Sequence, residues 1–249
     1  MTTLGLFVRL PVPGLVKTRL AAALGAERAA EAYTAFVHEL VERFQDTAGA
    51  RVLCYTPATD DSRAYFAGIA HSIVAREPRG AGESQGDTGG GRQEALRSPG
   101  QYEVWPQPAG ALGERLDQFF AERLRRDGDR VVVIGSDSPT LPREFVEQAF
   151  ELLDTADVVL GPATDGGYYL VGQRGRDWPI FEGIDWSTPR VLQQTVARVV
   201  QSGARLALLP PWYDVDTPED WQLLAGHIQA LLASGEEVSV RLRPLIALA

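Results

Sequence analysis

The stretch Arg130-Val-Val-Val-Ile-Gly-Ser-Asp-Ser-Pro139 joins an unbroken apolar run to a polar turn that follows it at once. Such a run is typical of a central parallel strand, because a strand of this kind is covered on both faces. In open α/β sheets, ligands bind outside the carboxyl ends of the strands. Asp137 would lie at that end, which makes it the first candidate for a functional carboxylate.

Short apolar runs alternate with longer amphipathic patterns on both sides of this stretch. Strands are predicted at residues 4–8, 51–55, 103–105, 130–134, 157–160, 168–171 and 206–209. Helices are predicted at residues 17–44, 62–70, 112–126, 145–153, 189–201 and 218–232. This alternation favours βαβ units and a mostly parallel sheet between two helical layers. We therefore predict a single three-layer α/β/α domain over residues 1–249. Residues 80–100 are rich in glycine and poor in large apolar side chains, so we predict a flexible loop there.

The overall composition narrows the classes of partner. The net charge is −9 and the pI about 4.9, so the average surface repels a nucleic-acid polymer. The single cysteine permits neither an intrachain disulfide nor a cysteine-rich zinc site. The sequence contains no signal-peptide pattern and no apolar window of roughly 20 residues, so we expect a cytoplasmic protein without a membrane partner. The oligomeric state is left open.

A proline- and glycine-containing turn, Pro11-Val-Pro-Gly-Leu-Val-Lys-Thr-Arg19, follows the first predicted strand and opens a helix. Gly14 permits a tight turn, and Lys17 and Arg19 fall near the helix N-terminus, where cations oppose the helix dipole by about 0.3–1 kcal/mol each. A bound anion would reverse that cost, so Pro13, Gly14, Lys17 and Arg19 are candidate phosphate-binding residues. On this argument, Lys17→Gln leaves the stability of the ligand-free protein unchanged or slightly higher. The alternative is a pair of solvated cations.

Two further segments carry candidates near Asp137. Asp137 could hold a divalent cation that bridges phosphate oxygens, with Ser136 as a neighbouring phosphate contact. Asp165-Gly-Gly-Tyr-Tyr169 could be a plain hairpin turn. Alternatively, Gly166 and Gly167 allow a sugar or base to approach the backbone, and Asp165 could act on an acceptor.

The segment Asp214-Val-Asp-Thr-Pro-Glu-Asp220 combines a helix start with two additional carboxylates. Helix capping accounts for residues 217–220, but it leaves Asp214 and Asp216 unexplained. Carboxylates two residues apart in an extended segment point the same way, and a metal ion would relieve their repulsion. Asp214 and Asp216 are therefore candidate metal ligands.

Taken in order, these motifs resemble the DUF2064 group of GT-A-fold, glycosyltransferase-like proteins, also called selenodomain-associated transferase 1. The resemblance rests on the motifs starting at Pro11, Gly135, Leu160 and Asp214 and covers roughly residues 4–225. The group is similar to the guanylyltransferases of phospholactate and of the molybdenum cofactor. The resemblance implies a nucleotide-diphospho-sugar transferase fold. It also implies nucleotide phosphates near Gly14, Lys17 and Arg19, and Mg²⁺ or Mn²⁺ at Asp137, Asp214 and Asp216.

Three functional hypotheses follow from these residues. The leading one is metal-dependent glycosyl transfer from a nucleotide-diphospho-sugar, with Lys17 and Asp137 acting on the departing diphosphate and Asp165 on the acceptor hydroxyl. The second is nucleotidyl transfer from a nucleoside triphosphate to a phosphorylated small molecule. The third is a nucleotide-binding module without catalysis. In each case the partner is a nucleotide-activated small molecule, and the sequence does not identify an acceptor.

Overall fold

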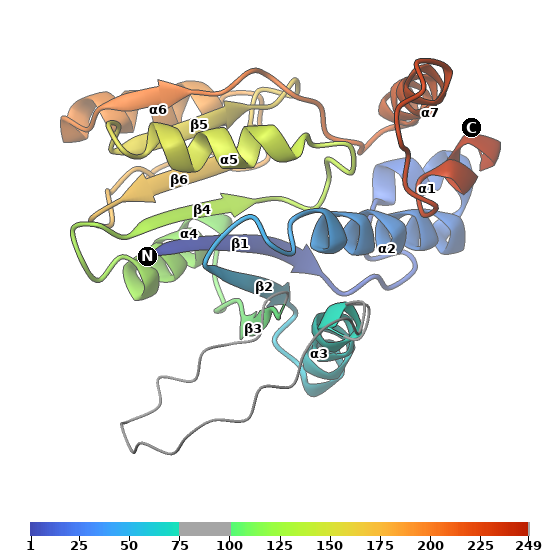
Figure 1. The fold of residues 1–249 in the computed structure, drawn as a ribbon, viewed down its shortest axis with the longest axis horizontal. Helices are drawn as coiled ribbons and strands as arrows, with labels where there is room; N and C mark the ends of the chain where they lie inside the picture. The colour runs from blue at the N-terminus through green and yellow to red at the C-terminus, as the bar shows by residue number, and fades with distance from the viewer. Residues whose placement is uncertain (75–100, 249) are drawn as a thin grey trace, which may run out of the picture.

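The computed structural model describes residues 1–74 and 101–248, and within them the chain forms one seven-stranded sheet. The strands are β1 (Thr2–Arg9), β2 (Ala50–Thr56), β3 (Glu103–Pro106), β4 (Arg130–Ile134), β5 (Val158–Pro162), β6 (Tyr168–Arg174) and β7 (Leu206–Leu208). Their order across the sheet is β3-β2-β1-β4-β6-β5-β7 (Figure 1). Strand β6 is antiparallel to both of its neighbours, and every other neighbouring pair is parallel. The predicted mostly parallel sheet is confirmed.

The helices are α1 (Thr18–Leu24), α2 (Ala26–Arg43), α3 (Asp60–Val74), α4 (Leu112–Arg123), α5 (Arg143–Leu152), α6 (Val191–Ser202) and α7 (Pro218–Ala233), followed by the 3-10 helix η1 (Arg243–Leu248). The single helix predicted at residues 17–44 is wrong, because the chain makes two helices there. Gly25, with φ 84°, separates them, since a positive φ interrupts the helical hydrogen-bond ladder at a residue that tolerates it.

Alternating side chains of the central strands enter two separate apolar layers. In β4, Val132 and Ile134 belong to one core, whereas Val131 and Val133 belong to the other. Helices α2, α3, α5 and α7 contribute to the first core, and α4 and α6 to the second. The continuous apolar run of β4 is therefore explained by burial on both faces, and the three-layer α/β/α architecture is confirmed.

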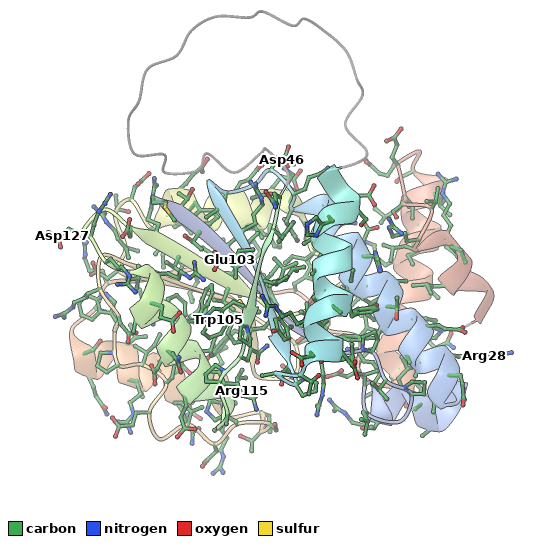
Figure 2. The ribbon with its side chains drawn as sticks, turned by 90° about the horizontal axis from the view of Figure 1, so that it is seen from below. Arg28, Asp46, Glu103, Trp105, Arg115 and Asp127 are labelled. Atoms are coloured by element: carbon green, nitrogen blue, oxygen red, sulfur yellow. The ribbon has the colours of Figure 1, made fainter. Side chains whose placement is uncertain are left out.

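Side-chain hydrogen bonds connect edge strand β3 to helix α4. Figure 2 labels Glu103 and Trp105 on β3, beside α4. Trp105 Nε1 donates to Glu122 Oε2 at 2.9 Å, and Arg123 donates to both carboxylate oxygens of Glu103 at 2.9 and 3.0 Å. These contacts fix the position of α4, whose first residue, Leu112, faces the cavities described below.

At the C-terminal side, α7 and η1 lie beside α1 and α2 (Figure 1). None of the helices in the described ranges has the length and apolar character that crossing a membrane requires. The loop predicted at residues 80–100 lies outside the described residues, and the extent of the domain over residues 1–249 stays a prediction.

Candidate functional site

The sheet topology gathers three distant segments at one end of the molecule. Strands β1 and β4 are parallel neighbours, so the turns that follow them leave the same edge of the sheet. The backbone N–H of Val215 donates to the carbonyl of Asp137 at 2.8 Å, which brings the segment before α7 to the same edge of the sheet. Lys17, Asp137 and Asp216 consequently meet, although Lys17 lies 120 positions from Asp137 and 199 positions from Asp216 along the chain.

Lys17 contacts both aspartates through its ammonium group. Its Nζ donates to Oδ1 of Asp137 and, at 2.9 Å, to Oδ1 of Asp216. The lysine side chain is 3% exposed, while those of Asp137 and Asp216 are 43% and 30% exposed. Burial alone would lower the pKa of Lys17, but the charges of the two aspartates outweigh it and hold that pKa above its usual value. The lysine is therefore a fixed cation with partly open partners.

The aspartates change the expected effect of replacing Lys17 on the stability of the ligand-free protein. From the sequence, Lys17 and Arg19 were expected to lack a counter-charge in the ligand-free protein. In the structure Arg19 Nη2 donates to Oδ2 of Asp216 at 2.8 Å, so Asp216 serves both cations. Burial would raise the pKa of Asp216, yet Lys17 and Arg19 keep it below its usual value. The protein already supplies the anion that we expected from a ligand, so replacing Lys17 now has a structural cost.

A buried tyrosine that sequence reasoning missed supports the same site. The hydroxyl of Tyr33, on α2, lies 2.7 Å from Ser136 Oγ and accepts from the backbone N–H of Arg9 at 2.9 Å. Burial, together with the negative charge of Asp137, raises the pKa of Tyr33 to about 12. Tyr33 thus ties the ends of β1 and β4 together as a neutral hydrogen-bonding group. A tyrosine within a helical apolar pattern carries no local motif that would have revealed this contact.

Asp214 lies next to the group around Lys17. Ser138 Oγ donates to Oδ1 of Asp214. Burial, followed by the charge of Asp137, raises the pKa of Asp214 to about 7.

The carboxylates suit a hard divalent cation in donor chemistry, because Mg²⁺ and Mn²⁺ take oxygen ligands. In the described ranges, however, no group of three or more acidic, histidine or cysteine side chains is preformed for a metal ion. Asp216 is paired with Lys17 and Arg19, Asp137 is paired with Lys17, and Asp214 accepts from Ser138. Asp137 and Asp214 are thus paired with fewer cations than Asp216, so they fit a metal ion better.

The glycine turn at residues 165–167 connects the antiparallel strands β5 and β6, as the hairpin interpretation supposed. Asp165 Oδ1 accepts from the backbone N–H of Gly167 at 2.8 Å. Gly166 has φ 91°, and a Cβ on it would lie 2.3 Å from the carbonyl oxygen of Pro189. The turn therefore needs glycine at 166 so that it can pack against the segment before α6.

A cavity of about 580 Å³ opens beside Lys17, and we call it the lysine cavity. Its described charged lining consists of three cations and two anions, namely Arg9, Lys17, Arg19, Asp137 and Asp216. Ser136 and Tyr33 also face it, whereas Pro13 and Gly14 lie in the turn that leads to it without lining it. Of the predicted nucleotide- and phosphate-binding residues, the lining of this cavity includes Lys17, Arg19 and Ser136 but not Pro13, Gly14, Gly166 or Gly167.

A second cavity, of about 720 Å³, adjoins the first, and we call it the tryptophan cavity because Trp186 lines it. Asp165, Gly167 and Asp214 face only this second cavity of the two, while Asp137, Asp216 and Arg19 line both. Arg19, Asp137 and Asp216 therefore lie at the junction of the two cavities, which differ in the charge of their lining.

Backbone strain in the described residues is concentrated at this junction. Lys17 and Ser187 are the two non-glycine residues there with positive φ, at 48° and 63°. Ser187 lines both cavities, and Lys17 lines the first. Such conformations cost of order 1–3 kcal/mol and are held by surrounding contacts, typically where a protein binds a ligand.

With this geometry described, comparison with known proteins gives the family. The model of DUF2064, described as an uncharacterized protein conserved in bacteria, matches residues 40–188. The chain belongs to the DUF2064 family. This confirms the resemblance expected from the motifs.

Two relatives place this DUF2064 protein among transferases. A Desulfovibrio desulfuricans G20 protein assigned to the nucleotide-diphospho-sugar transferases is 30% identical. That comparison covers 99% of this chain and 96% of the other, with a TM-score of 0.79. A 2-phospho-L-lactate guanylyltransferase of Methanopyrus kandleri is 37% identical over 118 residues, which span 45% of this chain and 57% of that protein. The DUF2064 chain is thus similar to nucleotidyl and nucleotide-sugar transferases.

More distant structures agree on the fold. A nucleotidyl transferase from Methanothermobacter covers 92% of this chain and 98% of its own, at 9% identity and a TM-score of 0.55. At that identity the likeness concerns the arrangement of the sheet and helices alone.

Proposed function

We propose that this protein is a metal-dependent transferase that moves a glycosyl group from a nucleotide-diphospho-sugar to an acceptor hydroxyl. The observation that carries the proposal is the contrast between the two adjoining cavities. Three cations against two aspartates line the lysine cavity, whereas four aspartates against one arginine line the tryptophan cavity. A nucleotide-diphospho-sugar consists of a nucleoside and a sugar that a diphosphate joins. Its two different ends match the two cavities of different charge, and its diphosphate matches the charged residues where the cavities meet.

In this proposal the lysine cavity receives the nucleoside diphosphate part of the donor. Lys17 and Arg19 would donate charge-assisted hydrogen bonds to the phosphate oxygens in exchange for those they make to Asp216. Arg9 adds a third positive group to the same lining. Ser136, held by Tyr33, offers a hydroxyl at the end of β4. The sugar would then extend across the junction toward the tryptophan cavity.

Mg²⁺ or Mn²⁺ would be held by Asp137 and Asp214, with Asp216 joining if Lys17 and Arg19 turn to the phosphates. When bound, such an ion neutralises charge on the departing diphosphate. Asp165 lines the tryptophan cavity, and its carboxylate would accept the proton of an acceptor hydroxyl there. Gly167 orients that carboxylate through its backbone N–H.

The test is a product analysis with a panel of nucleotide sugars and Mg²⁺ or Mn²⁺. Glycosyl transfer, or slow hydrolysis without an acceptor, releases the nucleoside diphosphate, and Asp137→Asn should reduce the release at least tenfold. Thr155→Ser, at an exposed position outside the lining of both cavities, is the matched control. No release from any nucleotide sugar, with protein that binds nucleotide diphosphate, would contradict the proposal.

A second candidate is nucleotidyl transfer, which the similarity to a guanylyltransferase over 118 residues favours. Here Lys17 and Arg19 would contact the phosphate groups of a nucleoside triphosphate, and a phosphorylated acceptor would attack the α-phosphate. The same assay separates the two reactions, because nucleotidyl transfer consumes a triphosphate and releases pyrophosphate. Binding without release of either product would leave a non-catalytic nucleotide-binding module.

A further inference from the structure

The tryptophan cavity is a large space whose charge is strongly one-sided. The aspartates that line it are Asp137, Asp165, Asp214 and Asp216, and the one cationic residue in its described lining is Arg19. Arg19 is already paired, since its Nη2 lies 2.8 Å from Asp216 Oδ2. Even with Asp214 protonated, three aspartates would face a single committed guanidinium. An anionic group entering this space would meet like charges.

A bound divalent cation would reduce this excess without reversing it. The ion would lie at Asp137 and Asp214, next to the diphosphate of the donor. The negative charge of that diphosphate would offset the positive charge of the ion. The part of the cavity beyond the junction is lined by Asp165 and by the segment from Trp186 to Pro189. No lysine or histidine is among the described residues that line the cavity.

The far wall is apolar, aromatic and rigidly held. The rings of Tyr168 and Trp186 meet edge to face, with centroids 6.4 Å apart at 78°, and Trp186 also packs against Phe181. On helix α4, a Cβ at Gly113 would lie 3.0 Å from Trp186 Nε1, so only a glycine leaves room for the indole at this distance. Such a fixed indole offers a flat apolar surface at little entropic cost.

We propose that the tryptophan cavity binds the acceptor as a ring-shaped alcohol that is uncharged or carries an amine, and that it disfavours phosphorylated and carboxylated acceptors. The apolar face of the ring would lie on Trp186 while a hydroxyl reaches Asp165. An ammonium group would gain from the aspartates and from the indole face. This inference rests on the proposed function, and it separates this chain from a transferase that acts on a phosphorylated acid.

The experiment measures acceptor binding without turnover. Ligand-observed saturation-transfer NMR would be run on the full chain with UDP or GDP and Mg²⁺. The probes are four matched series on hexose, pentose, inositol and ribonucleoside rings, each in unmodified, amine, phosphate and carboxylate form. We expect the unmodified and amine forms of at least one ring to bind at least tenfold more tightly than the phosphate and carboxylate forms. Equal or tighter binding of the anionic forms, or no binding by any form, would overturn the proposal.

Variants locate the binding in this cavity. Trp186→Ala should weaken the binding of the preferred ring at least tenfold, whereas Trp178→Ala, which removes an indole that lines neither cavity, should not. Asp165→Lys should narrow or invert the preference against the phosphate form. Thermal melts verify that each variant is folded, and retained binding in Trp186→Ala would contradict this location. Because nothing turns over in this measurement, its failure is distinct from a failure to release nucleoside diphosphate from a sugar donor.

Discussion

Nζ of Lys17 lies 2.9 Å from Oδ1 of Asp216, a residue 199 positions further along the chain. The same ammonium donates to Asp137, so one buried cation joins the turn after β1, the turn after β4 and the segment before α7. These contacts give Lys17 a structural role, and the proposed function gives it a second role in phosphate binding. Its two roles can be separated by experiment.

Replacing Lys17 with glutamine should destabilise the ligand-free protein by about 2 kcal/mol, because two partly buried carboxylates lose a charged donor. Chemical denaturation with urea measures the change in the free energy of unfolding. Arg19→Gln is the control: its side chain is 66% exposed, so it should cost no more than about 1 kcal/mol. Unchanged stability in Lys17→Gln would restore the view that a ligand alone supplies the counter-charge.

The ammonium of Lys17 donates to an oxygen of Asp137, one of the two carboxylates that would hold a divalent cation. Lys17→Met should therefore raise the affinity of the nucleotide-free protein for Mn²⁺ by about tenfold, roughly 1.4 kcal/mol, whereas Asp137→Asn should lower it. Electron paramagnetic resonance of free Mn²⁺ gives the dissociation constants directly. If both variants bound Mn²⁺ as the wild type does, the carboxylates around Lys17 would not be the metal site.

Gly166→Ala should destabilise the protein by about 3 kcal/mol. The added methyl group would collide with the backbone of Pro189, at a residue whose φ of 91° already disfavours a side chain. Gly128→Ala is the matched control, because its Cβ would meet no atom within 4 Å and its φ is not positive. Thermal unfolding of the two variants gives the comparison, and equal melting temperatures would disprove the predicted collision.

A partly buried carboxylate provides a pH-dependent prediction. Burial, followed by the charge of Asp117, raises the pKa of Asp177 to about 6. The folded state thus holds this proton more tightly than the unfolded state, so ionisation costs stability as the pH rises from about 4 through 6. Asp177→Asn should be neutral near pH 4 and stabilising by about 1 kcal/mol near pH 8, a figure reduced for partial exposure.

Urea unfolding at the two pH values measures this difference. Asp127→Asn, at an exposed position labelled in Figure 2, is the control for the same substitution at the surface. A gain in Asp177→Asn that was equal at both pH values would mean that the effect does not come from the charge.

The sequence allowed the fold to be predicted well, because its signals are local and repeated. The apolar run at residues 131–134 reports burial on both faces, and the cap at Thr217 marks the start of α7. The break at Gly25 was missed, since an isolated glycine within a helical pattern does not by itself reveal its φ. For the same reason, the two helices that result were predicted as one.

The site was predicted less completely, because its decisive contacts join distant parts of the chain. Asp137 was predicted from its place after an apolar strand, and Asp214 and Asp216 from carboxylates that helix capping leaves unexplained. Their pairing with Lys17 depends on sheet order, which no local pattern specifies. Tyr33 and Arg9 were missed as site residues because each belongs to a regular element and reaches the site only through the tertiary fold.

The span between Lys17 and Asp216 also has a consequence for biosynthesis. At about 5–20 residues per second, a ribosome adds Asp216 roughly 10–40 seconds after Lys17. During that interval the lysine has no second aspartate, and the segment that covers Asp137 does not yet exist. A nascent chain stalled before residue 214 should therefore leave the turn at residues 11–19 open to proteases, and the pairing of Lys17 with Asp216 should form only once residue 216 has emerged.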